Sequence, residues 1–259
     1  MKTCFSTLGC HDLELNQILK IANKYNIDAI EVRGIHHEMS NNKIEAFKNI
    51  KDTYELFKNS NVVPYILGTS CKFHDDTTRD SMIEKAYEEI QIASRNHFYG
   101  IRVFGNLIID STTIYKVIDS LNKICKYALD YKIHIFLEVH GDFNTIESLK
   151  EIVNHINYDN FSLIWDIYHT HFIYQNNWKE FYHELKNHIT HVHIKDVLDK
   201  KIVLPGKGEI DIVGIIQYLI DDGYTGYFSL EWERKWEPDL EPIEIALENY
   251  IRLLEVIHE

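Results

Sequence analysis

Four polar residues lie in apolar segments of the second half of the chain, where a buried strand would not otherwise carry them. They are Glu138 in LEVH, Asp166 in IWDIYH, His193 in HVHIKD and Glu231 in SLEWE. Three carboxylates held close together would repel one another, and some would take up protons unless a cation were present. The residue types therefore predict a site for one divalent metal ion. Oxygen-rich ligation with a single imidazole favours Mn²⁺, Mg²⁺ or Co²⁺, with Zn²⁺ as an alternative.

The rest of the chain must supply the elements that position these residues. Short apolar runs alternate with longer amphipathic stretches, a pattern typical of βαβ units and a parallel sheet. The predicted strands span residues 3–8, 28–33, 62–68, 100–105, 133–139, 161–167, 189–195 and 227–232. The predicted helices span residues 12–24, 42–59, 80–96, 111–131, 147–155, 178–186, 211–221 and 242–258.

The length of the chain favours one architecture for this pattern. Its 259 residues give about 32 per strand-helix unit, close to the ~250 residues of a typical eight-unit barrel. We therefore predict the α/β class, with a single (β/α)₈ TIM-barrel domain over residues 1–259. In such a barrel the four polar residues would converge on one mouth. An open doubly wound sheet is the alternative, but LGCHDLELN after the first strand lacks a glycine-rich nucleotide fingerprint.

Composition narrows the compartment and the partners. A formal net charge of −13 opposes binding to phosphate backbones, so we expect a small-molecule partner and no nucleic acid. The sequence has neither an 18-residue apolar stretch nor the pattern of a signal peptide, and its four cysteines form no CxxC pair. These features predict a cytoplasmic protein without a membrane partner, and they leave homo-oligomer formation open.

The motifs around the four residues resemble those of a known family. LEVHGD, WDIYHTH, HVHIKD, LPGKGEID and GYTGYFSLEWE follow one another as in the sugar phosphate isomerase/epimerase family of xylose isomerase-like barrels, which includes ketose 3-epimerases and inosose dehydratases. The N-terminal half is similar only in its strand rhythm and in DAIEVRG. The motifs are specific for the superfamily and say little about the substrate.

The resemblance implies roles for individual residues. Glu138, Asp166, His193 and Glu231 match the family's metal ligands, and Glu138 and Glu231 also match the carboxylates that move protons. His169 matches a position that hydrogen-bonds a substrate oxygen. The second histidine of the family's HxH strand is the ligand, which selects His193. Residues two apart on a strand share a face, so His191 is expected one layer deeper, as a core residue.

The reaction implied is that of a metal-dependent isomerase or epimerase acting on a sugar or sugar phosphate. The carboxylates would transfer a proton through a metal-stabilised enediolate. The alternative is a metal-dependent dehydratase of a keto-inositol or related keto-sugar, which shares the first step. Two further alternatives are an apurinic endonuclease-like hydrolase, which the acidity of the chain opposes, and an inactive sugar-binding barrel, which the intact ligand set opposes.

One segment departs from the ketose epimerase pattern. IKDVLDKKIV, which follows His193, lacks the arginine with which those enzymes hold substrate. Lys195 or Lys201 could replace it. Lys195 is predicted to lie beside the metal ligands and contact substrate, the alternative being a surface pair with Asp196.

Other residues are secondary candidates for substrate contacts, each with a structural alternative. His140 shares a face with Glu138 if the strand continues, and otherwise lies in a loop. Arg33, together with Glu31, His36 and His37, is placed after the second strand, where an arginine could clamp an anion. Trp236 is the candidate for a lid residue. Lys72 and His74 follow the third strand, Trp165 is expected to pack on the helix layer, and PGKG is interpreted as a turn at the barrel mouth.

Overall fold

The computed structural model describes residues 1–257, and its main sheet has the predicted class of fold. The parallel strands form a closed barrel in the order β1-β10-β7-β6-β5-β4-β3-β2, with a separate two-stranded sheet of β8 and β9. The chain divides into two compact units, Met1–Tyr65 with Thr190–Glu259, and Ile66–Ile189. A single domain over residues 1–259 stays a prediction. No helix within residues 1–257 combines the length and the apolar character needed to cross a membrane.

The unit of Met1–Tyr65 and Thr190–Glu259 contains both ends of the described chain. Its elements are β1 (Lys2–Ser6), η1 (Thr7–Cys10), α1 (Leu15–Lys24), β2 (Ala29–Val32), η2 (Asn41–Lys43), α2 (Glu45–Lys48), α3 (Ile50–Ser60), the start of β3 (Val63–Lys72), nearly all of β7 (Ile189–Ile194), β8 (Asp196–Leu198), β9 (Lys201–Val203), α9 (Ile212–Asp221), β10 (Tyr227–Leu230) and α10 (Ile243–Ile257). Strand β1 pairs with β2 and β10, and β10 pairs with β7, all parallel. Ser229 is level with His193 in this register, two residues before Glu231.

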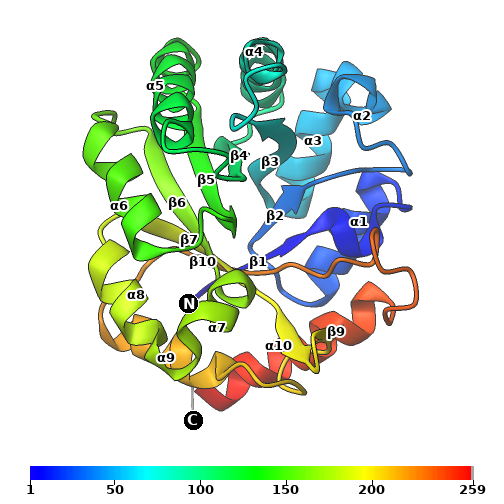
Figure 1. Ribbon diagram of the computed structural model, residues 1–259. Coiled ribbons are helices and arrows are strands. Elements are labelled where there is room, and N and C mark those ends of the chain that lie inside the picture. Colours follow the sequence, from blue (N-terminus) through cyan, green and yellow to red (C-terminus); the bar gives the residue numbers. More distant parts are fainter. Residues whose placement is uncertain (258–259) are drawn as a thin grey trace. The chain divides into compact units, whose positions relative to one another are not determined.

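The unit Ile66–Ile189 repeats the strand-helix alternation. It contains most of β3, then α4 (Arg79–Arg95), β4 (Gly100–Asn106), α5 (Thr113–Tyr131), β5 (His134–Gly141), α6 (Ile146–His155), β6 (Phe161–Asp166), α7 (Ile167–Tyr174), η3 (Gln175–Asn177) and α8 (Trp178–Leu185). Helices α4, α5 and α6 lie outside β4, β5 and β6 (Figure 1). In α5 the buried residues Val117, Leu121, Ile124 and Ala128 recur at helical spacing, because that face packs on the sheet.

Most predicted elements are present, with differences at particular residues. The predicted helix 42–59 is divided into η2, α2 and α3, because Asn49 has a non-helical backbone between α2 and α3. The third strand continues to Lys72, so that residue ends the strand rather than following it. The predicted last helix reaches His258, which lies outside the described residues.

Helix α7, the short η3 after it, and the strands β8 and β9 have no counterpart among the predicted segments. Helix α7 begins directly after β6, because the side chain of Asp166 accepts a hydrogen bond from the backbone N–H of Tyr168 and caps the helix. Residues 196–203 form the antiparallel hairpin of β8 and β9. PGKG forms a turn, as predicted, and its two glycines are needed there. Gly206 has a φ of +79°, and a Cβ at Gly208 would collide with the Asp196 carboxylate.

His134 at the start of β5 makes the stability of the fold depend on pH. Burial lowers the pKa of His134 from 6.5 to about 4, and its Nε2 lies 2.8 Å from the Ser162 hydroxyl. The unfolded chain binds this proton more readily, so the contribution of His134 is full above pH 6.5 and is lost as the pH falls towards 4.

We therefore expect His134→Gln to flatten the pH dependence of stability across this window, where the loss in the natural protein amounts to up to about 3 kcal/mol. Urea unfolding at several pH values measures this. The same variant at a solvent-exposed histidine, His183→Gln, is the control. An unchanged slope for His134→Gln would contradict the assignment.

Candidate metal and proton-transfer site

The unit Ile66–Ile189 holds two of the predicted ligands on adjacent strands. Glu138 in β5 and Asp166 at the end of β6 are 2% and 0% exposed. Glu138 is level with Ile164, so Asp166 lies two residues further along the same direction. A carboxylate oxygen of each lies within 4.8 Å of the other. This unit therefore buries two neighbouring carboxylates.

Arg102 on β4 is the cation that accompanies Glu138. Its Nη1 donates a hydrogen bond of 2.8 Å to Glu138 Oε2, and both side chains are almost fully buried. The guanidinium lies 4.2 Å from the centre of the Phe104 ring, where the π face adds a favourable contact. Sequence reasoning missed Arg102, although an arginine in the apolar run GIRVFG was a visible signal.

His140 and His169 lie beside Glu138. Their ring centroids are 4.2 Å apart, and polar atoms of Glu138, His140 and His169 lie within 4.8 Å of one another. His169 occupies the first turn of α7, with its Nε2 3.8 Å from Asp166 Oδ2. Both imidazoles are partly exposed, so they can contact both the buried carboxylates and a ligand.

The other unit holds His193 and Glu231. His193 lies in β7, and Glu231 follows β10, anchored by a hydrogen bond from its backbone N–H to the carbonyl of Ile194. His193 Nδ1 lies 3.6 Å from Glu231 Oε2, and both side chains are buried. Lys195, also buried, places its Nζ 2.7 Å from Glu231 Oε2 and 2.7 Å from Glu233 Oε1. Its ammonium thus bridges two carboxylates.

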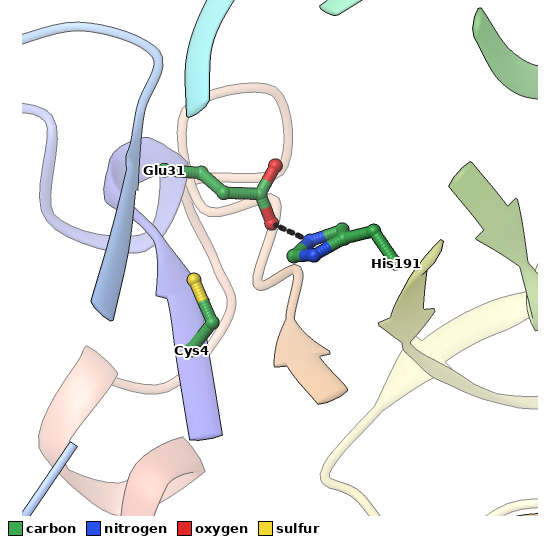
Figure 2. A group of neighbouring side chains, drawn as sticks. All are labelled: Cys4, Glu31 and His191. Atoms are coloured by element: carbon green, nitrogen blue, oxygen red, sulfur yellow. Dashed lines mark hydrogen bonds and ion pairs between the residues drawn. The ribbon is translucent and has the colours of Figure 1, made fainter. Parts of the chain in front are cut away.

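Glu31 corrects the sequence analysis. The predicted strand 28–33 contains Glu31, yet the residue was grouped with those that follow this strand; it lies inside β2 and is 4% exposed. His191 Nε2 is 2.8 Å from Glu31 Oε1 and His193 Nε2 is 3.0 Å from Oε2, while Ser229 donates its hydroxyl hydrogen to Oε1. Figure 2 shows Glu31 facing His191, with Cys4 beside them. Burial would raise the pKa of Glu31, but the two histidines hold it well below its usual range.

The remaining candidates have distinct placements. Arg33 donates from Nη1 to the carbonyl of Met39 in its own loop. The carboxylate of Asp196 accepts hydrogen bonds from the backbone N–H groups of Gly206, Gly208 and Ile210, so its main contacts are with the turn and not with a surface lysine. Trp236 is 56% exposed in the segment after β10.

The predictions that His191 and Trp165 are packed in the interior can be checked directly. His191 is fully buried, which confirms that it is a core residue. Trp165 is also fully buried and lies against the rings of Trp178, Phe181 and Tyr182 from α8, which confirms packing against the helix layer. His74 lies at 3.1 Å from the side-chain amide of Asn106.

Comparison with known proteins identifies the family. Residues 19–253 match the model of the xylose isomerase-like TIM barrel family, and the chain belongs to that family. A curated relative is the inosose isomerase of Bacillus velezensis, which is 26% identical over 89% of this chain and 88% of its own.

Two solved structures illustrate the shared fold. A D-tagatose 3-epimerase-like protein is 26% identical, covers 100% of this chain and 98% of its own, and has a TM-score of 0.75. The IOLI protein, solved with a bound zinc atom, is 22% identical, covers 99% and 98%, and has a TM-score of 0.78. The resemblance inferred from the motifs is thereby confirmed.

The buried pair of Arg102 and Glu138 can be tested by stability. Arg102→Met should cost about 3 kcal/mol, because it leaves the Glu138 carboxylate buried without its cation. Adding Glu138→Leu should recover much of that loss, since no charge then remains. The measurement is the free energy of urea unfolding in the presence of a chelator.

The exposed pair of Lys123 and Asp119 provides the matched control, and Lys123→Met should change the unfolding free energy by less than about 1 kcal/mol. A double variant no more stable than Arg102→Met would contradict the assignment.

Proposed function

We propose that the protein is a cytoplasmic, divalent-metal-dependent isomerase or epimerase of a sugar, sugar phosphate or related polyhydroxy ketone. The observation that carries the proposal is the pair of buried glutamates, Glu138 inside β5 and Glu231 directly after β10, each held by its own cation. Glu138 is bound by Arg102, and Glu231 is bound by Lys195. Carboxylates fixed in this way suit repeated proton transfer at a carbon next to a carbonyl.

The metal would be held by Glu138, Asp166, His193 and Glu231. The donor set fits, because it offers three carboxylates and one imidazole, which are hard ligands for Mn²⁺, Mg²⁺ or Co²⁺. Charge also supports it. In one unit the carboxylates of Glu138 and Asp166 lie near the guanidinium of Arg102, and in the other those of Glu231 and Glu233 share the ammonium of Lys195. A divalent cation would offset this excess of negative charge.

Zinc is included among the candidate metals. The bound zinc atom of the IOLI protein supports this choice, although the ligand set contains no thiolate. When bound, the metal would polarise the oxygens beside the reacting carbon and so acidify its C–H bond.

Glu138 and Glu231 would carry the protons. One carboxylate removes a proton from the carbon next to the carbonyl, which gives an enediolate, and the other delivers a proton. Delivery to the opposite face gives the epimer, and delivery to the neighbouring carbon gives the isomer. Arg102 and Lys195 favour the ionised form that each glutamate needs when it acts as the base. The glutamate that delivers the proton must first have taken one up from solvent, and the proton removed by its partner is returned to solvent after the reaction.

Substrate recognition is assigned to residues around these glutamates. His140 and His169, next to Glu138, would hydrogen-bond hydroxyl or carbonyl oxygens of the substrate. Lys195, which lies between the carboxylates of Glu231 and Glu233, is expected to contact substrate. Arg33 is expected to face an anionic group of the substrate. Trp236 is expected to cover the site as a lid. The names of the inosose isomerase and the D-tagatose 3-epimerase-like protein support keto-inositols and ketoses as the first compounds to test.

Proton exchange tests the proposed reaction. The purified protein, loaded with Mn²⁺, is incubated in D₂O with ketoses, sugar phosphates and keto-inositols, and deuterium is followed by NMR. We expect incorporation at one carbon next to the carbonyl, together with an isomeric product of unchanged mass apart from the label. Loss of water from the product would instead establish the dehydratase, and no exchange with any of these substrates would contradict the proposal.

Substitution of the two glutamates tests their roles. Glu138→Gln and Glu231→Gln should each lower the rate of exchange by about 100-fold or more, because the amide cannot accept the proton. Glu88→Gln on the exposed face of α4 is the matched control and should leave the rate unchanged. Full exchange activity in both active-site variants would rule out the assigned roles.

A further inference from the structure

We propose that Glu31 is a positioning residue that holds His193 with its Nε2 protonated and its Nδ1 available as the metal-binding atom. The proposal rests on the proposed function, since it assigns the atom through which His193 would bind the metal. It adds a residue that the sequence analysis gave no role at the metal site and that lies on β2, far from the ligands in the sequence.

The geometry begins with the two oxygens of Glu31. Oε2 lies 3.0 Å from His193 Nε2, and Oε1 lies 2.8 Å from His191 Nε2. An ionised carboxylate can only accept hydrogen bonds, so each histidine must present an N–H at Nε2. A neutral His193 then carries its lone pair on Nδ1, which lies 3.6 Å from Glu231 Oε2.

The two histidines and Ser229 make Glu31 a shared acceptor. Ser229 is level with His193 on the neighbouring strand and also donates to Glu31. The rings of His191 and His193 are nearly perpendicular, with centroids 5.4 Å apart, and His191 packs against Tyr65 at 5.5 Å. This packing limits rotation of either imidazole, so the hydrogen bonds to Glu31 select both the tautomer and the ring orientation.

A carboxylate behind a histidine also changes its strength as a ligand. In metal sites a carboxylate that accepts the distal N–H fixes the imidazole and raises its basicity, and loss of such a partner typically weakens metal binding 10- to 100-fold. Glu31 stands in that relation to His193. Cys4, Glu31 and His191 could themselves be considered a metal site, but Glu31 and His191 are hydrogen-bonded to each other and burial keeps the Cys4 thiol protonated by raising its pKa.

The first test uses Glu31→Gln, with Ser229→Ala as the matched control. His191 and His193 contact different oxygens of Glu31, and in glutamine an NH2 donor replaces one of these oxygens, so the pair of N–H acceptors is lost. Ser229→Ala leaves both acceptor oxygens in place. We expect Glu31→Gln to weaken Co²⁺ binding 10- to 100-fold in chelator competition and to alter the visible spectrum of the bound Co²⁺. Ser229→Ala should bind Co²⁺ within about 3-fold of the natural protein.

The second test needs no variant and so covers the case in which Glu31→Gln does not fold. Nitrogen NMR of the histidine-labelled natural protein reports the tautomer directly. Without metal, His191 and His193 should both be protonated at Nε2. With Cd²⁺ bound, His193 should couple to the metal through Nδ1.

The outcomes separate this inference from the proposed function. If the natural protein binds no metal, the proposed metal enzyme fails, but the metal-free tautomers still test Glu31. A His193 protonated at Nδ1 in the metal-free protein, coupling to Cd²⁺ through Nε2, or unchanged Co²⁺ affinity in Glu31→Gln would each overturn the role of Glu31.

Discussion

Burial of carboxylates is the constraint on which the rest of the structure depends. A carboxylate removed from water is costly unless cations or N–H donors surround it. Glu138, Glu231 and Glu31 are each at most 4% exposed. An arginine pairs with Glu138, a lysine pairs with Glu231, and two imidazoles contact Glu31. The interior of a barrel is usually filled with aliphatic side chains, so buried carboxylates with their desolvation penalty are unusual there. Groups buried in this way are common in catalytic sites.

The parallel strands make these arrangements possible. Because side chains alternate along a strand, His191 and His193 share one face of β7, and the register with β10 sets Ser229 level with His193. In the other unit the register of β4, β5 and β6 brings Arg102, Glu138 and Asp166 into the same neighbourhood. The positions of these side chains are therefore fixed by the pairing of the backbones.

Much of the fold could be predicted from the sequence, because strand and helix periods are local signals. The apolar runs located every barrel strand. Charged residues within those runs, such as Glu138 and Asp166, could be identified as candidate site residues. Glu31 breaks the run DAIEV in the same way. It was misplaced because its partners His191 and His193 lie 160 and 162 residues away, a separation that no local pattern reports.

Lys195 and α7 show two further limits of sequence reasoning. The prediction for Lys195 left open a place beside the metal ligands or a surface pair with Asp196. Its observed contacts include Glu233, 38 residues further on, and Asp196 is occupied by backbone N–H groups. Helix α7 was missed because its start depends on the cap formed by Asp166, a residue already interpreted as a ligand. Interpreting Asp166 as a metal ligand left its second role, that of a helix cap, unconsidered.

The central claim is the proposal that Glu138, Asp166, His193 and Glu231 hold one divalent metal ion. Anomalous diffraction from crystals grown with Mn²⁺ tests it most directly. The account predicts one strong peak whose protein ligands are Glu138, Asp166, His193 through Nδ1, and Glu231. The absence of a peak at these residues, or a peak bound instead by Cys4, Glu31 and His191, would contradict it.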